Sequence, residues 1–227
     1  MIKRSTDILF SVIGLLIASP LFLAIAVRIW LEDGRPIFYR GERVGRFGKA
    51  FRMLKFRTMV VNAERLGGSS TPKDDPRITR VGRFLRRYKL DELPQLINVL
   101  WGEMSLVGPR PQVKWAVALY DAGEQALLSM RPGMTDYASI WFRNEGELLN
   151  GSTDPDREYL EKIAPEKIRL GLTYVRHHSL AVDLGILAAT LLSLAGIHLG
   201  DRLAAIAPNG QRDNREAVSN GNRTASR

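Results

Sequence analysis

Two adjacent carboxylates, Asp91 and Glu92, are the strongest candidates for chemistry in this chain of 227 residues. They precede Leu93-Pro94, and proline is typical of the first turn of a helix. A helix N-terminus favours an ionised carboxylate, because its dipole and its free N–H groups stabilise negative charge. A lone acidic residue before a helix is most often only a cap. Here a cluster of arginines accompanies the pair, which favours chemistry on an anionic substrate.

The excess positive charge of the chain is concentrated near this pair. The net charge is +9, whereas residues 35–89 alone contain 16 Lys or Arg and 4 Asp or Glu, a net charge of +12. Such a block is either a solvated basic face or a site for an anionic partner, such as nucleic acid, phosphates or a lipid surface. The chain has no cysteine, which excludes a disulfide scaffold and a cysteine nucleophile.

Basic residues in and after this block are candidates for binding phosphate. Lys55 and Arg57 are expected on one face of a strand, because alternate residues of a strand point the same way. Two cations on one face could hold a diphosphate. Arg110 is bracketed by prolines and Arg143 follows an apolar run. Arginine suits bidentate phosphate binding, and a stiff loop lowers the cost of ordering it.

Short elements are expected to position these residues. Residues 36–59 alternate apolar pieces with glycine, which predicts a hairpin or short strands. Apolar stripes at helical spacing predict helices over 81–88 and 93–100, and the composition predicts further helices within 155–175 and 183–199. The helix near 183–199 is too short to span a membrane comfortably, so we expect it to be interfacial or packed on the core.

The N-terminal segment is the strongest membrane candidate. Residues 8–27 are almost wholly apolar and, as a helix, would measure about 30 Å, the thickness of a bilayer core. The segment could be a cleaved signal peptide, a spanning helix or a re-entrant segment broken at Ser19-Pro20. Pro20 cannot donate to the carbonyl of Leu16, and Ser19 could satisfy that freed group. Composition leaves the spanning and the re-entrant alternatives open.

Several ordered motifs resemble those of the small monotopic phosphoglycosyl transferases, the bacterial sugar transferase family. The resemblance covers about residues 1–200 and includes Ser19-Pro20 within the apolar segment. The other motifs are Lys55–Met59 (KFRTM), Leu90–Gln95 (LDELPQ), Asn98–Leu100 (NVL), Met104-Ser105, Val107–Pro111 (VGPRP) and Arg131–Thr135 (RPGMT).

This resemblance implies a reaction and a set of site residues. Such enzymes move a sugar-1-phosphate from a UDP-sugar to a polyprenyl phosphate, usually undecaprenyl phosphate, and release UMP. This is the first membrane step in the assembly of a polysaccharide or glycoconjugate. The family uses Mg²⁺ and an Asp-Glu pair, matched here by Asp91 and Glu92, and the Asp carries the phosphosugar. Lys55, Arg86 and Arg110 match cations of the family site, and Arg143 matches an arginine that holds phosphate. Either carboxylate could bind the metal, and Glu92 could instead take a proton from the acceptor phosphate.

The resemblance also implies an architecture and a location. We expect an α/β fold of the α+β type, mostly helical, with amphipathic interfacial helices. Residues 1–31 would form a re-entrant membrane helix hairpin broken at Ser19-Pro20. Residues 32–200 would form a cytosolic catalytic domain, and residues 201–227 a disordered tail. The protein would be monotopic, on the cytoplasmic face of the bacterial inner membrane. The sequence leaves open whether it forms a homodimer.

Two departures from the family pattern and three alternatives remain. Glu103 stands where many members have Asp, and Thr135–Ser139 differs near the sugar or nucleotide end, which leaves the sugar open. A nucleic-acid binder would need aromatic residues among its cations, but residues 60–89 offer only Phe84 and Tyr88, so we expect no nucleic acid partner. A glycosidase would need its carboxylates to flank the scissile bond. A non-catalytic, basic, membrane-associated binding protein is the remaining alternative.

Overall fold

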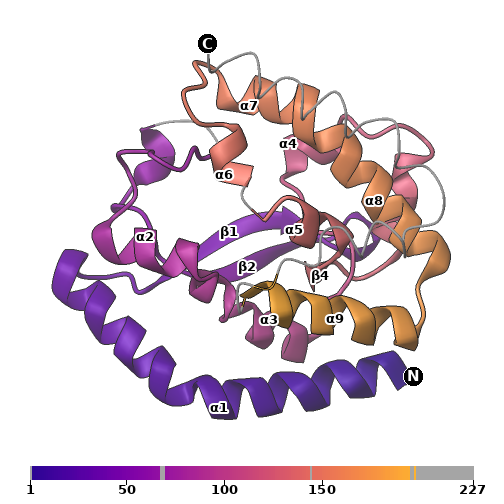
Figure 1. Ribbon diagram of the computed structural model, residues 1–227, viewed down its shortest axis with the longest axis horizontal. Helices are drawn as coiled ribbons and strands as arrows, with labels where there is room; N and C mark the ends of the chain where they lie inside the picture. The colour runs from indigo at the N-terminus through magenta and orange to yellow at the C-terminus, as the bar shows by residue number, and fades with distance from the viewer. Residues whose placement is uncertain (1, 67–69, 144, 195–196, 198–227) are drawn as a thin grey trace.

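The computed structural model describes residues 2–66, 70–143, 145–194 and 197. Helices dominate these residues, and two separate two-stranded sheets lie among them (Figure 1). The α-helices are α1 (Ile2–Asp33), α2 (Arg80–Arg87), α3 (Gln95–Trp101), α4 (Lys114–Val117), α5 (Tyr137–Trp141), α6 (Glu145–Leu148), α7 (Pro155–Glu158), α8 (Ala164–His177) and α9 (Leu180–Leu194). The strands are β1 (Phe38–Val44), β2 (Ala50–Phe56), β3 (Ser105–Val107) and β4 (Gly133–Thr135). The predicted α+β, mostly helical class is confirmed.

Helix α1 is continuous, with Pro20 inside it. The described residues of this segment form one helix that bends along the lower edge of the molecule (Figure 1), not two separate helices, and the re-entrant topology of residues 1–31 stays a prediction. The Ser19 hydroxyl donates to the carbonyl of Leu16 over 2.8 Å, as predicted for the group that Pro20 leaves free. This local repair allows the helix to continue through the proline.

The predicted hairpin over residues 36–59 is confirmed. Strands β1 and β2 pair antiparallel, with Phe38 opposite Phe56 and Tyr39 opposite Lys55. The ring of Phe56 is 1% exposed and packs edge-on against Phe22 of α1 at 5.0 Å. This apolar contact, joined by Ile25 and Ile29, holds the second half of α1 against the hairpin.

Strands β3 and β4 form a short parallel pair at the centre of the molecule. Where the chain leaves β3 it comes very close to β4: a Cβ on Gly133 would lie 2.1 Å from the backbone nitrogen of Gly108. Only glycine permits this approach at both positions. The crossing brings the Gly108–Pro111 and Arg131–Thr135 motifs together, although residues 112–130 separate them in the chain.

The largest core cluster surrounds these strands and joins them to α3, α5, α8 and α9. Its buried members include Val99, Met104, Tyr137, Tyr174 and Ile186. The helices predicted over 81–88, 93–100, 155–175 and 183–199 are confirmed, with boundaries shifted by a few residues and a π-helical turn, η5 (Tyr159–Ile163), between α7 and α8. The predicted tail at 201–227 lies outside the described residues.

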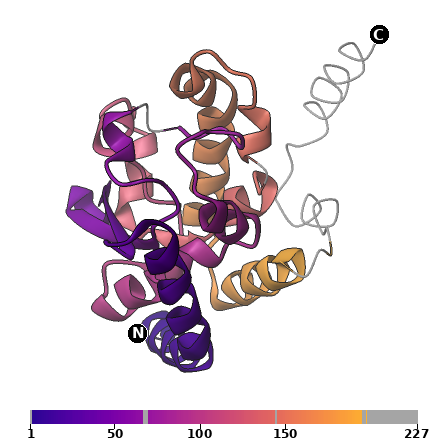
Figure 2. The same ribbon diagram turned by 90° about the vertical axis from the view of Figure 1, so that its left-hand side faces the viewer.

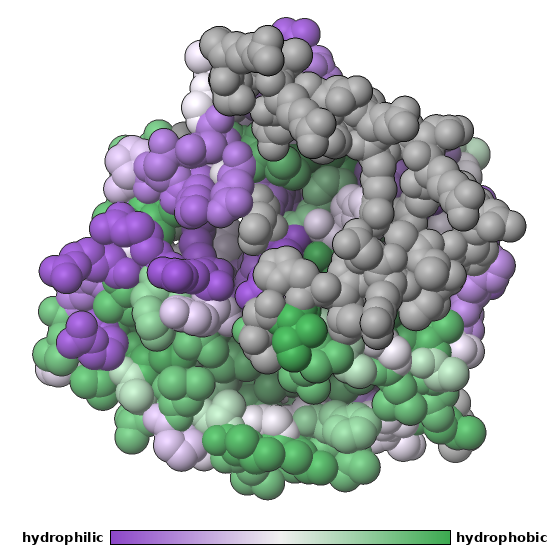
Figure 3. Space-filling view, in the orientation of Figure 1, coloured by the Kyte–Doolittle hydropathy of each residue, from purple (hydrophilic) through white to green (hydrophobic). Residues whose placement is uncertain are grey.

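One edge of the molecule is apolar. Helices α1 and α9 lie along it (Figures 1 and 2), and the surface there is predominantly hydrophobic in the view of Figure 3. Within α1, Leu16 is 69% exposed and Ile17 is 77% exposed. By length and composition, α1 is the one helix among the described residues that could cross a membrane, and little of its apolar stretch is buried by the rest of the chain.

Candidate active site

The turn that carries Asp91 and Glu92 is held from both sides. It is a single 3-10 turn, η3 (Leu90–Glu92), which leads through Leu93-Pro94 into α3. Lys89, immediately before it, adopts the left-handed conformation (φ 57°), which turns the chain sharply between α2 and η3. At the far end of α3, Arg4 of α1 donates to the carbonyls of Val99 and Leu100. Cations at a helix C-terminus stabilise its unpaired carbonyl groups.

Glu92 is bound by two cations from different elements. Lys55 Nζ at the end of β2 donates to Glu92 Oε1 over 2.8 Å, and the guanidinium of Arg110 donates to both carboxylate oxygens. Burial alone would raise the pKa of Glu92, but Arg110 and Lys55 outweigh it and hold that pKa well below its ordinary value. Glu92 is therefore a firmly ionised carboxylate that fixes two cations in place.

Asp91 lies in a different environment. Its side chain is buried, and its Oδ1 has no hydrogen-bond partner among the described residues. Burial raises the pKa of Asp91 above its ordinary value. Among the neighbouring charges Lys55 has the strongest effect, and it opposes this rise. An acceptor atom that is buried without a partner is costly, so it is typical of a functional position. The second carboxylate thus retains an oxygen for an incoming group.

A groove of about 2440 Å³ opens over this pair. Its cations come from β2, from α2 and from the segments that follow α2, β3 and α5; they include Lys55, Arg86, Lys89, Arg110 and Arg143. The Arg86 Nε donates to the Thr58 hydroxyl over 2.9 Å, which orients the guanidinium beside the carboxylate dyad, Asp91 and Glu92. Strongly hydrophilic surface gathers on this side of the molecule (Figure 3). The concentration of positive charge in a groove suits a diphosphate.

A smaller pocket of about 110 Å³ adjoins the groove. Lys89, Glu92, Arg110 and Arg143 line it together with Thr135, Ser139, Ile140, Thr190 and Ser193, among others. Arg143 donates to the Ser193 hydroxyl of α9 over 2.8 Å. The pocket therefore joins the charged dyad to the apolar edge of the molecule, and it includes the segment in which this sequence departs from the family pattern.

Arg57 lines the groove with the other predicted phosphate-binding residues, but its guanidinium is engaged by other parts of the chain. It follows β2 and is 7% exposed. Its guanidinium donates to the carboxylate and carbonyl of Asp33 and to the carbonyls of Gly34 and Pro36. These contacts hold the connection between α1 and β1 in place and oppose a role for Arg57 in binding diphosphate beside Lys55, which stays a prediction.

Two further lysines line this region without having been predicted. Lys89 is adjacent to the dyad, and its position before Leu90-Asp91 could have identified it. Lys167 of α8 binds Glu145 over 2.5 Å and lies 5.0 Å from the centre of the Tyr159 ring. No motif connects Lys167 to the dyad in the sequence, because only the tertiary fold brings α8 to this pocket.

The residues present fit a magnesium ion at Asp91. Among the described residues, no group of three or more His, Cys, Asp or Glu side chains could enclose a metal. Mg²⁺ does not need such a cage, since it commonly binds one or two carboxylates together with substrate phosphates and water. The Asp91 carboxylate offers one ligand, whereas Glu92 is already bound by Lys55 and Arg110.

Comparison with known proteins gives one consistent family. The family model described as "Bacterial sugar transferase" matches residues 1–196. The chain is 39% identical over 204 residues to the "Exopolysaccharide production protein ExoY" of Sinorhizobium fredii (strain NBRC 101917 / NGR234), covering 83% of each chain. It is 37% identical over 199 residues to the "UDP-glucose:undecaprenyl-phosphate glucose-1-phosphate transferase" of Escherichia coli (strain K12), covering 84% of this chain and 39% of that one.

A shorter match has higher identity. Over 111 residues the chain is 50% identical to the "Putative undecaprenyl-phosphate N-acetylgalactosaminyl 1-phosphate transferase" of Bacillus subtilis (strain 168), covering 49% of this chain and 62% of that one. The names of these relatives include two different sugars, glucose and N-acetylgalactosamine. The family match extends over α1, the dyad and both pockets, and the chain belongs to the bacterial sugar transferase family, as an enzyme of the phosphoglycosyl transferase type.

Proposed function

We propose that this protein transfers a sugar-1-phosphate from a UDP-sugar to undecaprenyl phosphate, releasing UMP, as the first membrane step in building a glycan. The observation that carries the proposal is the asymmetry of the dyad: Glu92 is bound by Lys55 and Arg110, while Asp91 Oδ1 is buried beneath a basic groove without a partner among the described residues. This arrangement suits attack on a diphosphate, because cations can neutralise both the substrate and the departing phosphate.

Asp91 is the nucleophile in this proposal. Its carboxylate oxygen attacks the phosphorus that bears the sugar, and the bond from that phosphorus to the bridging oxygen breaks as UMP leaves. An oxygen of undecaprenyl phosphate then attacks the aspartyl phosphorus. The new bond gives undecaprenyl diphosphate sugar, and the Asp91 carboxylate is regenerated. A carboxylate needs no activating base for the first attack, since it is already ionised when it reacts.

The neighbouring residues divide the remaining work. Glu92 holds Lys55 and Arg110 beside the groove, where both can contact phosphate oxygens. Arg86, oriented by Thr58, stabilises charge that develops on the departing UMP. We propose that Asp91 also holds Mg²⁺, which when bound would neutralise diphosphate oxygens. Arg143, at the smaller pocket near α9, would hold the acceptor phosphate.

We propose further that α1 enters the membrane and returns to the same side. Its first turns are tied to the domain: Lys3 donates to Val107 and Asp183, and Asp7 accepts from Ser105 and the Leu106 backbone. Its last turn is tied to the same domain, because Glu32 accepts from the backbone N–H groups of Arg80 and Val81. A helix that crosses a bilayer leaves its ends on opposite sides, which these contacts oppose.

The bilayer would then cover the exposed middle of α1 and the neighbouring face of α9. Leu16, Ile17 and Leu23 are each more than two-thirds exposed, and Leu191 of α9 is 67% exposed. This placement makes the protein monotopic and holds the acceptor phosphate at headgroup depth beside the smaller pocket. We propose the cytoplasmic face of the bacterial inner membrane, where strongly basic segments are favoured.

Single-cysteine labelling tests this topology, since the chain has no cysteine of its own. Ile2→Cys reports the side of the membrane on which α1 begins, and Phe47→Cys reports the side on which the β1–β2 hairpin lies. Both side chains are accessible, at 72% and 67% exposed. A membrane-impermeant maleimide added to sealed inverted vesicles should label both. Labelling of Phe47→Cys alone, with Ile2→Cys labelled only after the vesicles are opened, would establish a spanning helix.

Release of UMP tests the reaction. Purified protein in nanodiscs receives Mg²⁺, undecaprenyl phosphate and each of a panel of UDP-sugars, with Asp91→Asn as the control. We expect UMP from at least one donor, loss of that product in Asp91→Asn, and a phosphosugar adduct on the Asp91 peptide when acceptor is omitted. A folded protein that gives no UMP with any donor would favour the non-catalytic, basic membrane-binding alternative.

A further inference from the structure

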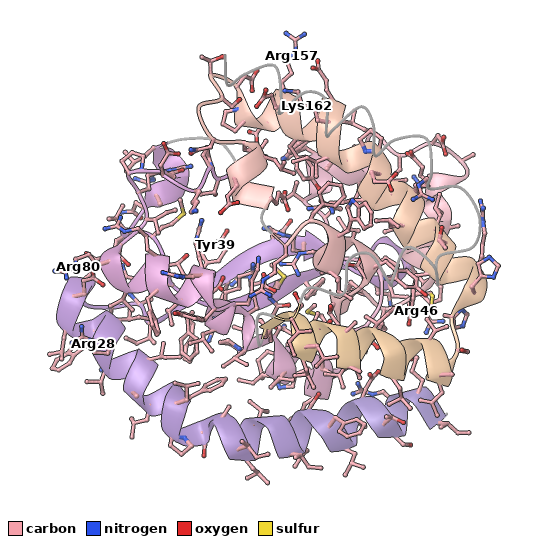
Figure 4. All side chains as sticks on the ribbon, viewed as in Figure 1. Arg28, Tyr39, Arg46, Arg80, Arg157 and Lys162 are labelled. Carbon is pink, nitrogen blue, oxygen red and sulfur yellow. The ribbon has the colours of Figure 1, made fainter. Side chains whose placement is uncertain are left out.

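Tyr39 occupies a distinctive place in the groove. It lies on β1 directly opposite Lys55, and the groove lining includes both residues. Figure 4 shows Tyr39 in the central hollow of the molecule, away from the apolar edge formed by α1 and α9. Side chains of paired residues in adjacent strands lie about 5 Å apart. Lys55 in turn binds Glu92, so Tyr39 is the cross-strand neighbour of a residue that contacts the dyad.

Gly41 determines how the Tyr39 ring lies. Residues 39 and 41 share one face of β1, and a Cβ added to Gly41 would lie 2.7 Å from Cε1 and 2.9 Å from the hydroxyl oxygen of Tyr39. The ring therefore lies over the Gly41 backbone, in space that any other side chain would occupy. The strand therefore supports the ring from below at Gly41, and Tyr39 is among the residues that line the groove.

We propose that Tyr39 is the platform on which the base of the nucleotide donor stacks, an inference that rests on the proposed function. A ring held flat beside a phosphate-binding cluster has the geometry of an aromatic base-stacking site. The lipid acceptor approaches from the apolar edge, so the polar nucleoside of the donor occupies the opposite part of the groove. Tyr39 lies in that part, next to the cations that would hold the diphosphate.

The test compares binding of UMP with binding of inorganic pyrophosphate, in full-length protein in nanodiscs. Tyr39→Ala should weaken UMP binding roughly 10-fold, as expected for loss of one stacked base, and leave pyrophosphate binding within about twofold. Tyr39→Phe should bind both ligands like the wild type, because it keeps the ring. Donor KM should rise in Tyr39→Ala while kcat changes little. Thermal unfolding of each variant reports whether the fold is intact.

Gly41→Ala provides an independent test at a second residue. The added methyl group displaces the ring, so this variant should lose UMP affinity selectively, as Tyr39→Ala does. In the Tyr39→Ala background the same methyl group meets no ring, and Gly41→Ala should have no further effect on UMP binding. Such a non-additive result is the signature of two residues that act through one contact.

Three outcomes would overturn the proposal, and they separate it from the reaction itself. Tyr39→Ala that binds UMP normally, or that loses UMP and pyrophosphate equally, would contradict base stacking while the transferase activity stands. Wild-type protein that neither binds UMP nor releases it from any donor would overturn the proposed function together with the platform.

Discussion

Asp91 and Glu92 are adjacent in the chain, yet their carboxylates experience opposite electrostatic environments. Burial raises the pKa of Asp91, whereas Arg110 and Lys55 overcome burial and lower the pKa of Glu92. The Asp91 oxygen Oδ1 has no partner among the described residues, while Glu92 binds two cations. One carboxylate is thus held ready to react, and the other organises the charges around it.

This difference predicts opposite effects of two isosteric substitutions on stability. Asp91→Asn should leave the free energy of unfolding at neutral pH unchanged or raise it, because it removes a charge that burial disfavours. Glu92→Gln should lower it by roughly 3 kcal/mol, because Lys55 and Arg110 lose their shared counter-charge. Denaturant unfolding of both variants measures the two values, and equal losses would contradict the assignment.

The same groups predict a shift in the pH dependence of transfer. The nucleophile must be ionised, so activity should fall on the acid side at a pH above the ordinary Asp value of 3.8. Lys55 favours the ionised form of Asp91, and Lys55→Met should move this acid limb to higher pH. Single-turnover UMP release as a function of pH measures the limb.

The control for this shift is Lys49→Met, which removes the same charge from an exposed position in the β1–β2 turn. Its acid limb should coincide with that of the wild type. An acid limb that stays fixed in Lys55→Met would show that a group other than Asp91 governs it. The effect of Asp91 on stability changes with pH in the opposite direction to its effect on activity. Its protonated form stabilises the folded protein at low pH, and this contribution is lost as the pH rises through the raised pKa.

Periodicity predicted the elements that depend on local sequence. The stripe around Val81 and Leu85 gave α2, and the Gly-punctuated apolar pieces gave the β1–β2 hairpin. It did not predict the parallel pairing of β3 with β4, because each strand has three residues and the close contact of Gly108 with Gly133 is tertiary. The chemistry of Pro20 correctly predicted the hydrogen bond from Ser19 to the Leu16 carbonyl, although the helix continues through the proline.

Side-chain partners limited the prediction of the site in the same way. Motifs placed Asp91, Glu92, Lys55 and Arg110 near one another, and these residues do meet. Alternation along a strand could not show that β2 ends before Arg57. The Arg57 guanidinium donates instead to the carbonyls of Asp33 and Gly34 at the end of α1. The partners of a long cation are chosen by the fold around it, which a local pattern does not record.

The attachment of α1 to the domain predicts energetic coupling between Lys3 and Asp183. Asp183 is 5% exposed and accepts from Lys3 Nζ over 2.7 Å and from the Tyr174 hydroxyl over 2.6 Å. Asp183→Asn keeps an acceptor for Tyr174 but loses the charge, so stability should fall by about 1–2 kcal/mol. In a double-mutant cycle with Lys3→Met the two losses should be less than additive. Fully additive losses would show that the ion pair contributes nothing.

Arg57 offers the sharpest distinction between a structural and a substrate-binding cation. Its planar guanidinium reaches three carbonyls and the Asp33 carboxylate at once, which a lysine ammonium cannot reproduce. Arg57→Lys should therefore lower the free energy of unfolding by roughly 2 kcal/mol and leave donor KM within about twofold. The matched exchange two residues earlier, Lys55→Arg, should instead change donor KM or the acid limb with little loss of stability. If Arg57→Lys keeps full stability and raises donor KM, Arg57 belongs with the phosphate-binding residues after all.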